Sequence, residues 1–319
     1  MSDNVLLIGG SGFLGTALAE NLARRGTPFT VLSRSRVCPP RLARLLHEHG
    51  NLGAYVSGDC RDEKLTDEVI ARHDQIIYLA YTNMGGVSSA DPITELRENL
   101  SSSAIVFEAT ARHKKKIIFV SSGGTVYGSS GQVPINETHP TAPISSYGKT
   151  KVAIEKYAFE LSQSIGLKYI ILRPGNAYGI GQVPFRGQGF IATAIASVLK
   201  GEPVRIFGQP GAVRDYVYIA DMAEAIAVTM KKGEIGATYN IGSGRGYSNE
   251  EIVKEIESVV SSDGLVVARE HLPGRPQDVA RIILDSSRLS LQTGWRPVVG
   301  LTEGLRHTCL WLRNLLGIS

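Results

Sequence analysis

The fold is decided by the stretch VLLIGGSGFLG, residues 5–15. Its first four residues are a continuous apolar run that predicts a buried strand, and helical spacing follows from Phe13 to Arg25. Between strand and helix, Gly9, Gly12 and Gly15 form a G-x-x-G-x-x-G turn. In such a turn the first glycine permits a tight bend, the second lets a pyrophosphate approach the backbone, and the third lets the helix pack closely. The order strand, turn, helix favours a dinucleotide site over the alternative of an ordinary glycine turn.

Further short apolar runs are separated by longer stretches with helical spacing. Such runs predict strands that are buried on both faces, and hence a parallel sheet with helical crossovers. We therefore expect an α/β fold with a Rossmann-type, doubly wound parallel sheet. The expected strands lie at 29–32, 54–56, 76–79, 117–120 and 169–172, and the expected helices include 93–113 and 146–164.

The regular alternation ends near Pro174, and glycine and proline become frequent between Gly175 and Gly211. This change predicts two units: a dinucleotide-binding domain over 1–174, and a smaller C-terminal α/β substrate-binding lobe over 175–319. A late apolar run at 237–241 is a candidate for a strand that returns to the main sheet.

Composition narrows the classes of partner. The chain is 43% hydrophobic and 20% charged, with a net charge of +4 whose basic residues are dispersed, which argues against nucleic acid as a partner. The apolar stretches are too short to span a bilayer, and no leader is expected before Asn4. Cys38, Cys60 and Cys309 lack metal-ligand spacing, so we expect no metal and free thiols in a reducing compartment. The sequence thus predicts a cytoplasmic protein.

The residues after the second and third strands bear on the identity of the dinucleotide. NAD-binding proteins usually carry a carboxylate after the second strand, whereas this chain has Ser33-Arg34. Either Arg34 accommodates a 2′-phosphate, so that NADP is tolerated or preferred, or it is a solvated side chain or stacks on adenine. Asp59 follows the third strand, where it could accept a bond from adenine or cap the helix starting near Asp62.

Tyr147 and Lys151 carry the strongest signal for catalysis. Residues four apart share one face of a helix, so the ammonium would lie beside the phenol. A neighbouring positive charge would lower the pKa of the tyrosine and suit it to act as a base. The alternative is a surface Tyr/Lys pair. The segment Ser121 to Thr125 weighs against that alternative, because it places hydroxyls after a strand at the carboxyl edge of the sheet.

At this point the chain resembles the extended short-chain dehydrogenase/reductase family, and above all its nucleotide-sugar epimerases. The resemblance runs from Val5 to about Leu305. The matching segments are Gly9 to Gly15, Gly58-Asp59, Leu79-Ala80, Asn99, SSGGTVYG at 121–128, Tyr147 to Lys151, LRPGNAYG at 172–179, RDYVYIAD at 214–221, YNIGSG at 239–244 and RPQDV at 275–279.

The resemblance implies roles for single positions. Tyr147 would be the acid/base, Lys151 would also hold the nicotinamide ribose, and Asn176 would lie against the sugar and diphosphate. Arg214 and Arg275 would grip the diphosphate, which arginine suits chemically, or they would form salt bridges with Asp215 and Asp278. Asp278 would face a ribose or orient Arg275. The implied cofactor residues are Gly9, Ser11, Gly12, Phe13, Leu14, Gly15, Ser33, Arg34, Asp59, Leu79, Ala80, Asn99, Ser121, Tyr147, Lys151 and Pro174.

The chain departs from the family at the catalytic hydroxyl. Family epimerases usually carry a serine where this chain has Gly123, so the hydroxyl comes from Thr125 or Ser122, or is absent. If the segment is an extended strand, side-chain alternation favours Thr125; a bend at the glycines would turn Ser122 inward. Family dehydratases carry Thr-Asp-Glu at positions 123–125, so the residues found here exclude a dehydratase.

These observations predict an enzyme, a nucleotide-sugar 4-epimerase that works through a transient 4-keto sugar on a UDP-linked hexose or N-acetylhexosamine. The first alternative is an NADPH-dependent nucleotide-sugar 4-ketoreductase, which Ser33-Arg34 favours. A non-catalytic dinucleotide-binding regulator is a third hypothesis, with Gly123 as its support. By resemblance we expect a homodimer that pairs through the helices at 93–113 and 146–164.

Overall fold

The computed structural model describes residues 4–82, 91–187, 189–261, 264–275 and 279–318. Within these ranges, no helix combines the length and apolar character needed to cross a membrane.

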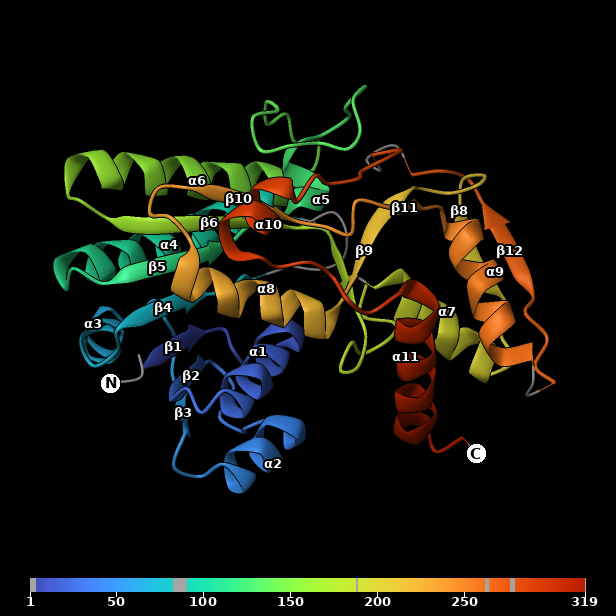
Figure 1. Cartoon of the computed structure of the whole chain (residues 1–319), viewed down its shortest axis with the longest axis horizontal. Coiled ribbons are helices and arrows are strands. Elements are labelled where there is room, and N and C mark those ends of the chain that lie inside the picture. Colours follow the sequence, from blue (N-terminus) through green and yellow to red (C-terminus); the bar gives the residue numbers. More distant parts are fainter. Residues whose placement is uncertain (1–3, 83–90, 188, 262–263, 276–278, 319) are drawn as a thin grey trace.

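The main sheet is parallel and is covered by helices on both faces (Figure 1). The described strands of this sheet number seven, in the order β10-β6-β5-β4-β1-β2-β3, and every neighbouring pair is parallel. This confirms the predicted doubly wound α/β fold. The strands are β1 (Val5–Ile8), β2 (Phe29–Ser33), β3 (Gly53–Ser57), β4 (Gln75–Tyr78), β5 (Lys116–Val120), β6 (Lys168–Pro174) and β10 (Thr238–Ile241).

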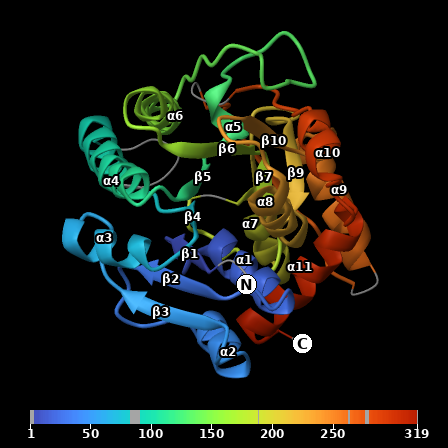
Figure 2. The same cartoon turned by 60° about the vertical axis from the view of Figure 1, so that its left-hand side comes forward.

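Alternate residues of the strands enter two different cores. Val5 and Leu7 of β1 pack with the helices on one face, and Leu6 and Ile8 pack with the helices on the other. This is the two-residue period of a strand buried on both sides, which is why the runs are apolar throughout. Figure 2 shows the two layers. One layer holds α1 (Phe13–Arg24), α2 (Pro40–Glu48) and α8 (Ile219–Lys232), and the other holds α3 (Glu63–Ala71), α4 (Pro92–Arg112) and α6 (Ser146–Ser164).

Caps fix the starts of the two helices that border the site. The Asp91 carboxylate accepts a bond from the Thr94 amide (3.0 Å) ahead of Pro92, the first residue of α4. The Ser145 hydroxyl accepts a bond from the Gly148 amide (3.1 Å), so that α6 begins directly before Tyr147. Capping residues of this kind set where a helix starts, and here they confirm the expected helices to within one residue.

The chain that follows β6 forms two small sheets. One has the order β11-β9-β7 and the other pairs β12 with β8. Strand β10 and helix α8 come from this half of the chain but belong to the main sheet and its cover. The remaining elements are β7 (Asn176–Tyr178), α7 (Phe190–Leu199), β8 (Val204–Phe207), β9 (Arg214–Tyr218), β11 (Gly246–Tyr247), α9 (Asn249–Val260), β12 (Arg269–Leu272), α10 (Ser287–Thr293) and α11 (Leu301–Leu316), together with the short α5 (Gly123–Val126).

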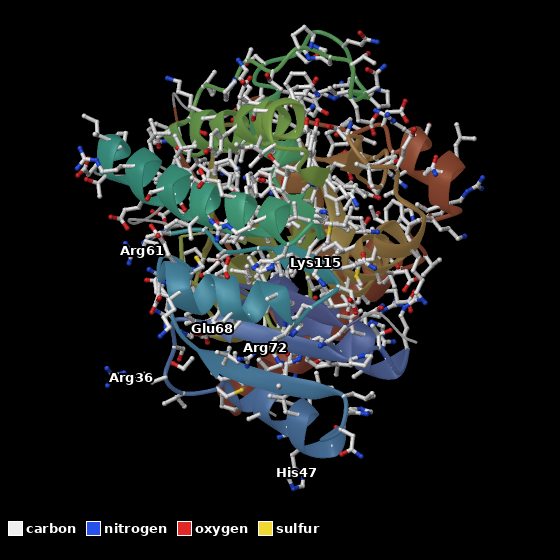
Figure 3. The ribbon with its side chains drawn as sticks, turned by 90° about the vertical axis from the view of Figure 1, so that its left-hand side faces the viewer. Arg36, His47, Arg61, Glu68, Arg72 and Lys115 are labelled. Atoms are coloured by element: carbon white, nitrogen blue, oxygen red, sulfur yellow. The ribbon has the colours of Figure 1, made fainter. Side chains whose placement is uncertain are left out.

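Charged side chains are spread over the surface as the sequence predicts. Figure 3 shows Arg36, Arg61, Arg72 and Lys115 set apart from one another on one side of the molecule. Several have acidic neighbours: Arg72 lies 4.0 Å from Glu68, and Lys115 lies 3.8 Å from a carboxylate oxygen of Asp74.

Candidate active site

A cleft of about 1090 Å³ runs from the glycine turn of the main domain into the second lobe. The carboxyl ends of β1, β4, β5 and β6 meet at its floor, which is where open α/β sheets bind ligands. Its wall includes these predicted residues: Gly9, Gly12, Phe13, Leu14, Gly15, Leu79, Ser121, Ser122, Thr125, Tyr147, Lys151, Pro174, Asn176, Arg214 and Arg275.

The glycine turn fits a bound pyrophosphate. Gly9 has φ +80°, and a Cβ there would lie 2.6 Å from the Ala80 backbone at the end of β4. A Cβ on Gly15 would overlap the Gly10 backbone, so the third glycine allows close packing of α1. At Gly12 a Cβ would have nothing nearer than 3.7 Å, and this residue precedes α1 without a side-chain cap. The N–H groups at the start of α1 therefore face an open side, as an anion-binding helix terminus requires.

The end of β2, where the cofactor ribose is expected, carries hydroxyls in place of a carboxylate. The Ser33 hydroxyl is buried and lies 2.6 Å from the hydroxyl of Ser11, while Arg34 is exposed. A neutral pair of hydroxyls does not repel a 2′-phosphate.

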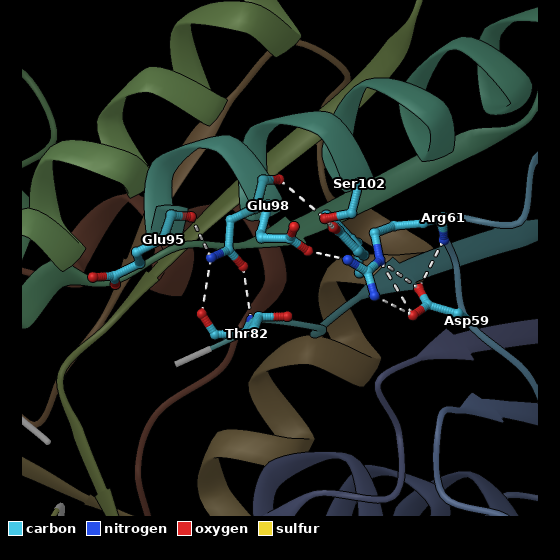
Figure 4. A network of polar contacts seen from close by, with 8 residues as sticks. Asp59, Arg61, Thr82, Glu95, Glu98 and Ser102 are labelled. Carbon is cyan, nitrogen blue, oxygen red and sulfur yellow. Dashed lines mark hydrogen bonds and ion pairs between the residues drawn. The ribbon is translucent and has the colours of Figure 1, made fainter. Parts of the chain in front are cut away.

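Asp59 lies in an ion-pair network at the end of β3, as Figure 4 shows. Its carboxylate pairs with Arg61 at 2.8 Å, and Arg61 also pairs with Glu98 of α4. The hydrogen bond from Arg61 lowers the pKa of Asp59. Asp62 accepts the Leu65 amide (3.0 Å) and is the cap of α3, so the alternative in which Asp59 caps that helix is wrong.

Asn99 is fully buried behind the cleft, where it holds the chain segment after β4. Its amide accepts the Thr82 N–H (2.7 Å) and donates to the carbonyls of Thr82 (2.9 Å) and Glu95 (2.8 Å) (Figure 4). Both donor positions of the amide are thus used within the protein. Asn99 thus fixes the backbone of the segment that follows β4, in which Leu79 and Tyr81 line the cleft.

Tyr147 and Lys151 share one face of α6, as the spacing predicts. The Lys151 ammonium nitrogen lies 5.7 Å from the centre of the Tyr147 ring and donates to the Val120 carbonyl at 3.0 Å. Burial lowers the pKa of Lys151 to about 7. Burial also raises the pKa of Tyr147 to about 12, with a hydrogen bond from Ser122 acting in the opposite direction. The pKa of Tyr147 is therefore raised in this structure, whereas the spacing to Lys151 predicts a lowered one, because burial is the largest cause of the shift.

The segment after β5 is a helical turn and not an extended strand. Ser122 is the last extended residue (φ −156°, ψ 105°) and α5 follows it, so the alternation argument that favoured Thr125 is wrong. The Ser122 hydroxyl is the one that hydrogen-bonds Tyr147. Thr125 also lines the cleft, and among the described residues its buried hydroxyl has no hydrogen-bond partner.

The two glycines of this turn face opposite ways. A Cβ on Gly123 would meet Leu284 (2.6 Å) and the Arg173 carbonyl (2.7 Å), whereas one on Gly124 would lie 3.3 Å from the Asn176 side-chain oxygen. A side chain at 123 would therefore point into the protein in this backbone conformation. The glycine there leaves Ser122 as the hydroxyl beside Tyr147.

A buried ion pair links α6 to strand β6 of the main sheet. Glu155, one turn beyond Lys151, pairs with Arg173 of β6 at 2.6 Å. It also accepts a bond from Ser121, whose hydroxyl is buried and turned toward Glu155. Ser121, predicted to bind the cofactor, thus directs its hydroxyl to the supporting network, although the residue contributes to the cleft wall.

The second lobe brings the two predicted arginines into the same cleft. Arg214 donates to the carbonyls of Val213 (3.0 Å) and Val279 (2.6 Å), and the guanidinium carbon of Arg275 stacks 3.6 Å from the centre of the Phe207 ring. Asp215, the suggested salt-bridge partner of Arg214, is buried. Its carboxylate accepts the amides of Ser243 (2.7 Å), Gly244 (3.1 Å) and Leu284 (3.1 Å). Asp278 lies outside the described residues, so its predicted roles are not tested.

Two residues of the cleft wall, Tyr81 and Glu95, are absent from the sequence predictions. The Tyr81 hydroxyl donates to the Glu95 carboxylate at 2.5 Å, and Glu95 is 1% exposed. The signal that points to Glu95 is its spacing: it precedes Asn99 by four residues and so shares a face of α4 with it.

Comparisons with known proteins agree with this geometry. Residues 5–242 match the family model described as the NAD dependent epimerase/dehydratase family. A putative UDP-glucose 4-epimerase of Methanocaldococcus jannaschii is 28% identical, covering 97% of this chain and 98% of the relative. A dTDP-4-dehydro-6-deoxyglucose reductase of Escherichia coli is 30% identical, covering 95% of each chain.

Solved structures show the same fold. The UDP-glucose 4-epimerase of Thermus thermophilus, in complex with NAD, has a TM-score of 0.85 and 32% identity, covering 97% of this chain and 99% of that one. The enzyme of Thermotoga maritima with UDP-glucose has a TM-score of 0.87 and 30% identity, covering 98% and 99%. The chain therefore belongs to the NAD-dependent epimerase/dehydratase family.

Proposed function

We propose that this protein is a nucleotide-sugar 4-epimerase acting on a UDP-linked hexose or N-acetylhexosamine. One observation carries the proposal: Tyr147, Lys151 and Ser122 meet in a cleft that joins a dinucleotide turn to a lobe bearing two arginines. The named relatives support the same reaction, because similar proteins are UDP-glucose 4-epimerases and one structure was solved with UDP-glucose.

The chemistry follows from the placement of the side chains. Tyr147 takes the proton of the sugar 4-hydroxyl and later returns it, and Ser122 hydrogen-bonds at the same oxygen. Arg214 and Arg275 hold the diphosphate, while the sugar turns over between the two half-reactions. The glycine turn and Lys151 would hold a nicotinamide cofactor, which would supply reversible hydride transfer.

Mixing the purified protein with UDP-glucose and with UDP-N-acetylglucosamine tests this proposal. We expect NMR of the anomeric protons to show conversion of one of these sugars to its 4-epimer, with no net change in reduced nicotinamide. Consumption of NADPH with a nucleotide-linked 4-keto-6-deoxy sugar, and no epimerisation, would overturn it.

That second outcome defines the alternative function, a nucleotide-sugar 4-ketoreductase. Two observations favour it: the reductase of Escherichia coli among the relatives, and the absence of a carboxylate at Ser33-Arg34. The third hypothesis, a non-catalytic regulator, rests on the missing side chain at Gly123. We propose instead that Ser122, which hydrogen-bonds Tyr147, supplies the hydroxyl.

We propose that NAD is the working cofactor and that NADP also binds. NAD is present in a solved epimerase that is 32% identical to this chain, and the hydroxyl pair Ser11–Ser33 together with exposed Arg34 gives a 2′-phosphate room and a counter-charge.

We also propose a cytoplasmic homodimer. The paired helices α4 and α6 cover one face of the main sheet and expose Leu96 and Phe159. Light scattering would check the dimer, and a monomeric mass at micromolar concentration would contradict it.

A further inference from the structure

Glu95 is a buried carboxylate in the wall of the catalytic cleft that the mechanism above does not use. One of its oxygens accepts the Tyr81 hydroxyl at 2.5 Å and the other accepts the Ser146 hydroxyl at 3.1 Å. Ser146 lies directly before Tyr147 on α6, and Tyr81 follows β4. Glu95, from α4, therefore ties together two segments that border the catalytic tyrosine.

Tyr81 also contacts Tyr147 directly. Its ring meets the Tyr147 ring edge-on, with 4.8 Å between the ring centres, and the Lys151 nitrogen lies 4.7 Å from the centre of the Tyr81 ring. Thr150, on the next turn of α6, also hydrogen-bonds the Tyr81 hydroxyl. Ser146 and Thr150, each next to a member of the Tyr147/Lys151 pair, thus hydrogen-bond to Glu95 and Tyr81 respectively.

Several charged or titratable groups face Tyr147 from the packed elements. Lys151 lies on its own helix, Tyr81 comes from the end of β4, and Glu95 comes from α4. Ser122 donates from the residue before α5. The negative charge of Glu95 raises the pKa of Tyr147, acting in the same direction as burial. Glu155 lies beyond Lys151 and pairs with Arg173.

We propose that Glu95 is a positioning residue of this active site, which fixes Tyr147 through Tyr81 and Ser146. Its charge also opposes ionisation of the phenol, so it favours the step in which Tyr147 returns a proton over the step in which Tyr147 takes one up. The catalytic meaning of this proposal rests on the proposed function, but the protonation of Tyr147 can be measured without turnover.

The test is a spectroscopic titration of Tyr147. Phenolate absorbance is followed against pH, and the signal of Tyr147 is the difference between each protein and the same protein carrying Tyr147→Phe. Glu95→Gln keeps the shape and removes the charge. It replaces one of the two acceptor oxygens by an NH2 donor, toward which the hydroxyl on that side must turn a lone pair. We expect the Tyr147 transition to move down by roughly one pH unit, the effect of a unit charge a few ångströms away in a partly dry site.

Glu108→Gln is the matched control. Glu108 also lies on α4 and accepts a tyrosine hydroxyl from α6, that of Tyr157 at 2.9 Å, but on the exposed part of the helix pair. We expect no shift of the Tyr147 transition in this variant. An equal shift in both variants, or none in a folded Glu95→Gln protein, would overturn the proposal.

Tyr81→Phe provides a second test that holds if Glu95→Gln does not fold. It keeps the ring against Tyr147 and leaves the carboxylate in place with one donor fewer. The Tyr147 transition should then stay where it is or move up. A downward shift in Tyr81→Phe would contradict a role for the charge. Failure of the epimerase assay alone would leave all these titrations unchanged, so the two proposals fail separately.

Discussion

Replacing Ser122 by alanine removes a hydroxyl that hydrogen-bonds Tyr147 in this structure. The bond is made to an oxygen that gains negative charge as the sugar proton moves, so it matters most in the transition state. Loss of a donor of this type costs about 10²–10³-fold in kcat, or about 2.7–4 kcal/mol. We expect the lower end, about 10²-fold, because water can partly replace the hydroxyl in an open cleft.

Two further readouts separate this role from simple damage to the fold. The KM for the nucleotide sugar should change little, since the proposed diphosphate ligands Arg214 and Arg275 lie in the other lobe. The acidic limb of the kcat/KM profile should move to higher pH, because the Ser122 bond is what opposes the rise in the Tyr147 pKa. Steady-state kinetics over a pH range, with either 4-epimer as substrate, measures both quantities.

Thr125→Val is the control from the same turn. The Thr125 hydroxyl is buried without a partner among the described residues, so valine should stabilise the fold slightly, by about 1 kcal/mol, and should lower kcat less than about 10-fold. If Ser122→Ala keeps a third of the wild-type kcat while Thr125→Val is crippled, the assignment of the hydroxyl reverses. If both variants are fully active, no hydroxyl assists Tyr147.

Four other outcomes are expected. Tyr147→Phe should lower kcat by about 10²–10⁴-fold and leave NAD binding unchanged by calorimetry; near-normal turnover would assign the acid/base elsewhere. Arg214→Ala should weaken UDP binding by roughly 10–100-fold with dinucleotide binding unaffected, and equal UDP affinity would point to a structural arginine. NADP should bind within about tenfold of NAD, because the hydroxyls of Ser11 and Ser33 do not repel a 2′-phosphate. Calorimetric titration with both would detect a stronger discrimination (about 1.4 kcal/mol per tenfold). Lys151→Met should abolish turnover yet stabilise the fold. The folded pKa of about 7 lies below the ordinary 10.5, so the gain should be largest below pH 7 and should shrink as the pH rises toward 10.5; thermal melts with no such trend would refute this.

The sequence predicts the parts of this protein that depend on periodicity. Strands buried on both faces must be apolar throughout, and residues four apart must share a helix face, so the sheet and the Tyr147/Lys151 pair follow from the pattern alone. The turn at Gly123-Gly124 does not, because two residues without side chains carry no periodic signal that distinguishes a strand from a helix.

The burial of Tyr147 and Glu95 could not be predicted from the sequence either. The pKa of Tyr147 depends on how much water the folded cleft excludes, and the spacing to Lys151 says nothing about that. Glu95 resembles the exposed acidic residues common in the first turn of a helix. Its burial becomes evident only when α4 is packed against α6 and the end of β4.

The return of β10 to the main sheet has a consequence for dissecting this enzyme. A fragment that ends at residue 174 would hold the glycine turn and the catalytic pair, yet it would leave β6 as a bare edge strand. That edge carries the apolar residues Ile171 and Leu172, which β10 now pairs with in register. Unprotected edges of this kind recruit other strands, so the isolated fragment is prone to aggregate. Strand β10 thus protects the edge of the main sheet, and a fragment of the nucleotide-binding part that ends at residue 174 would need a substitute for this strand.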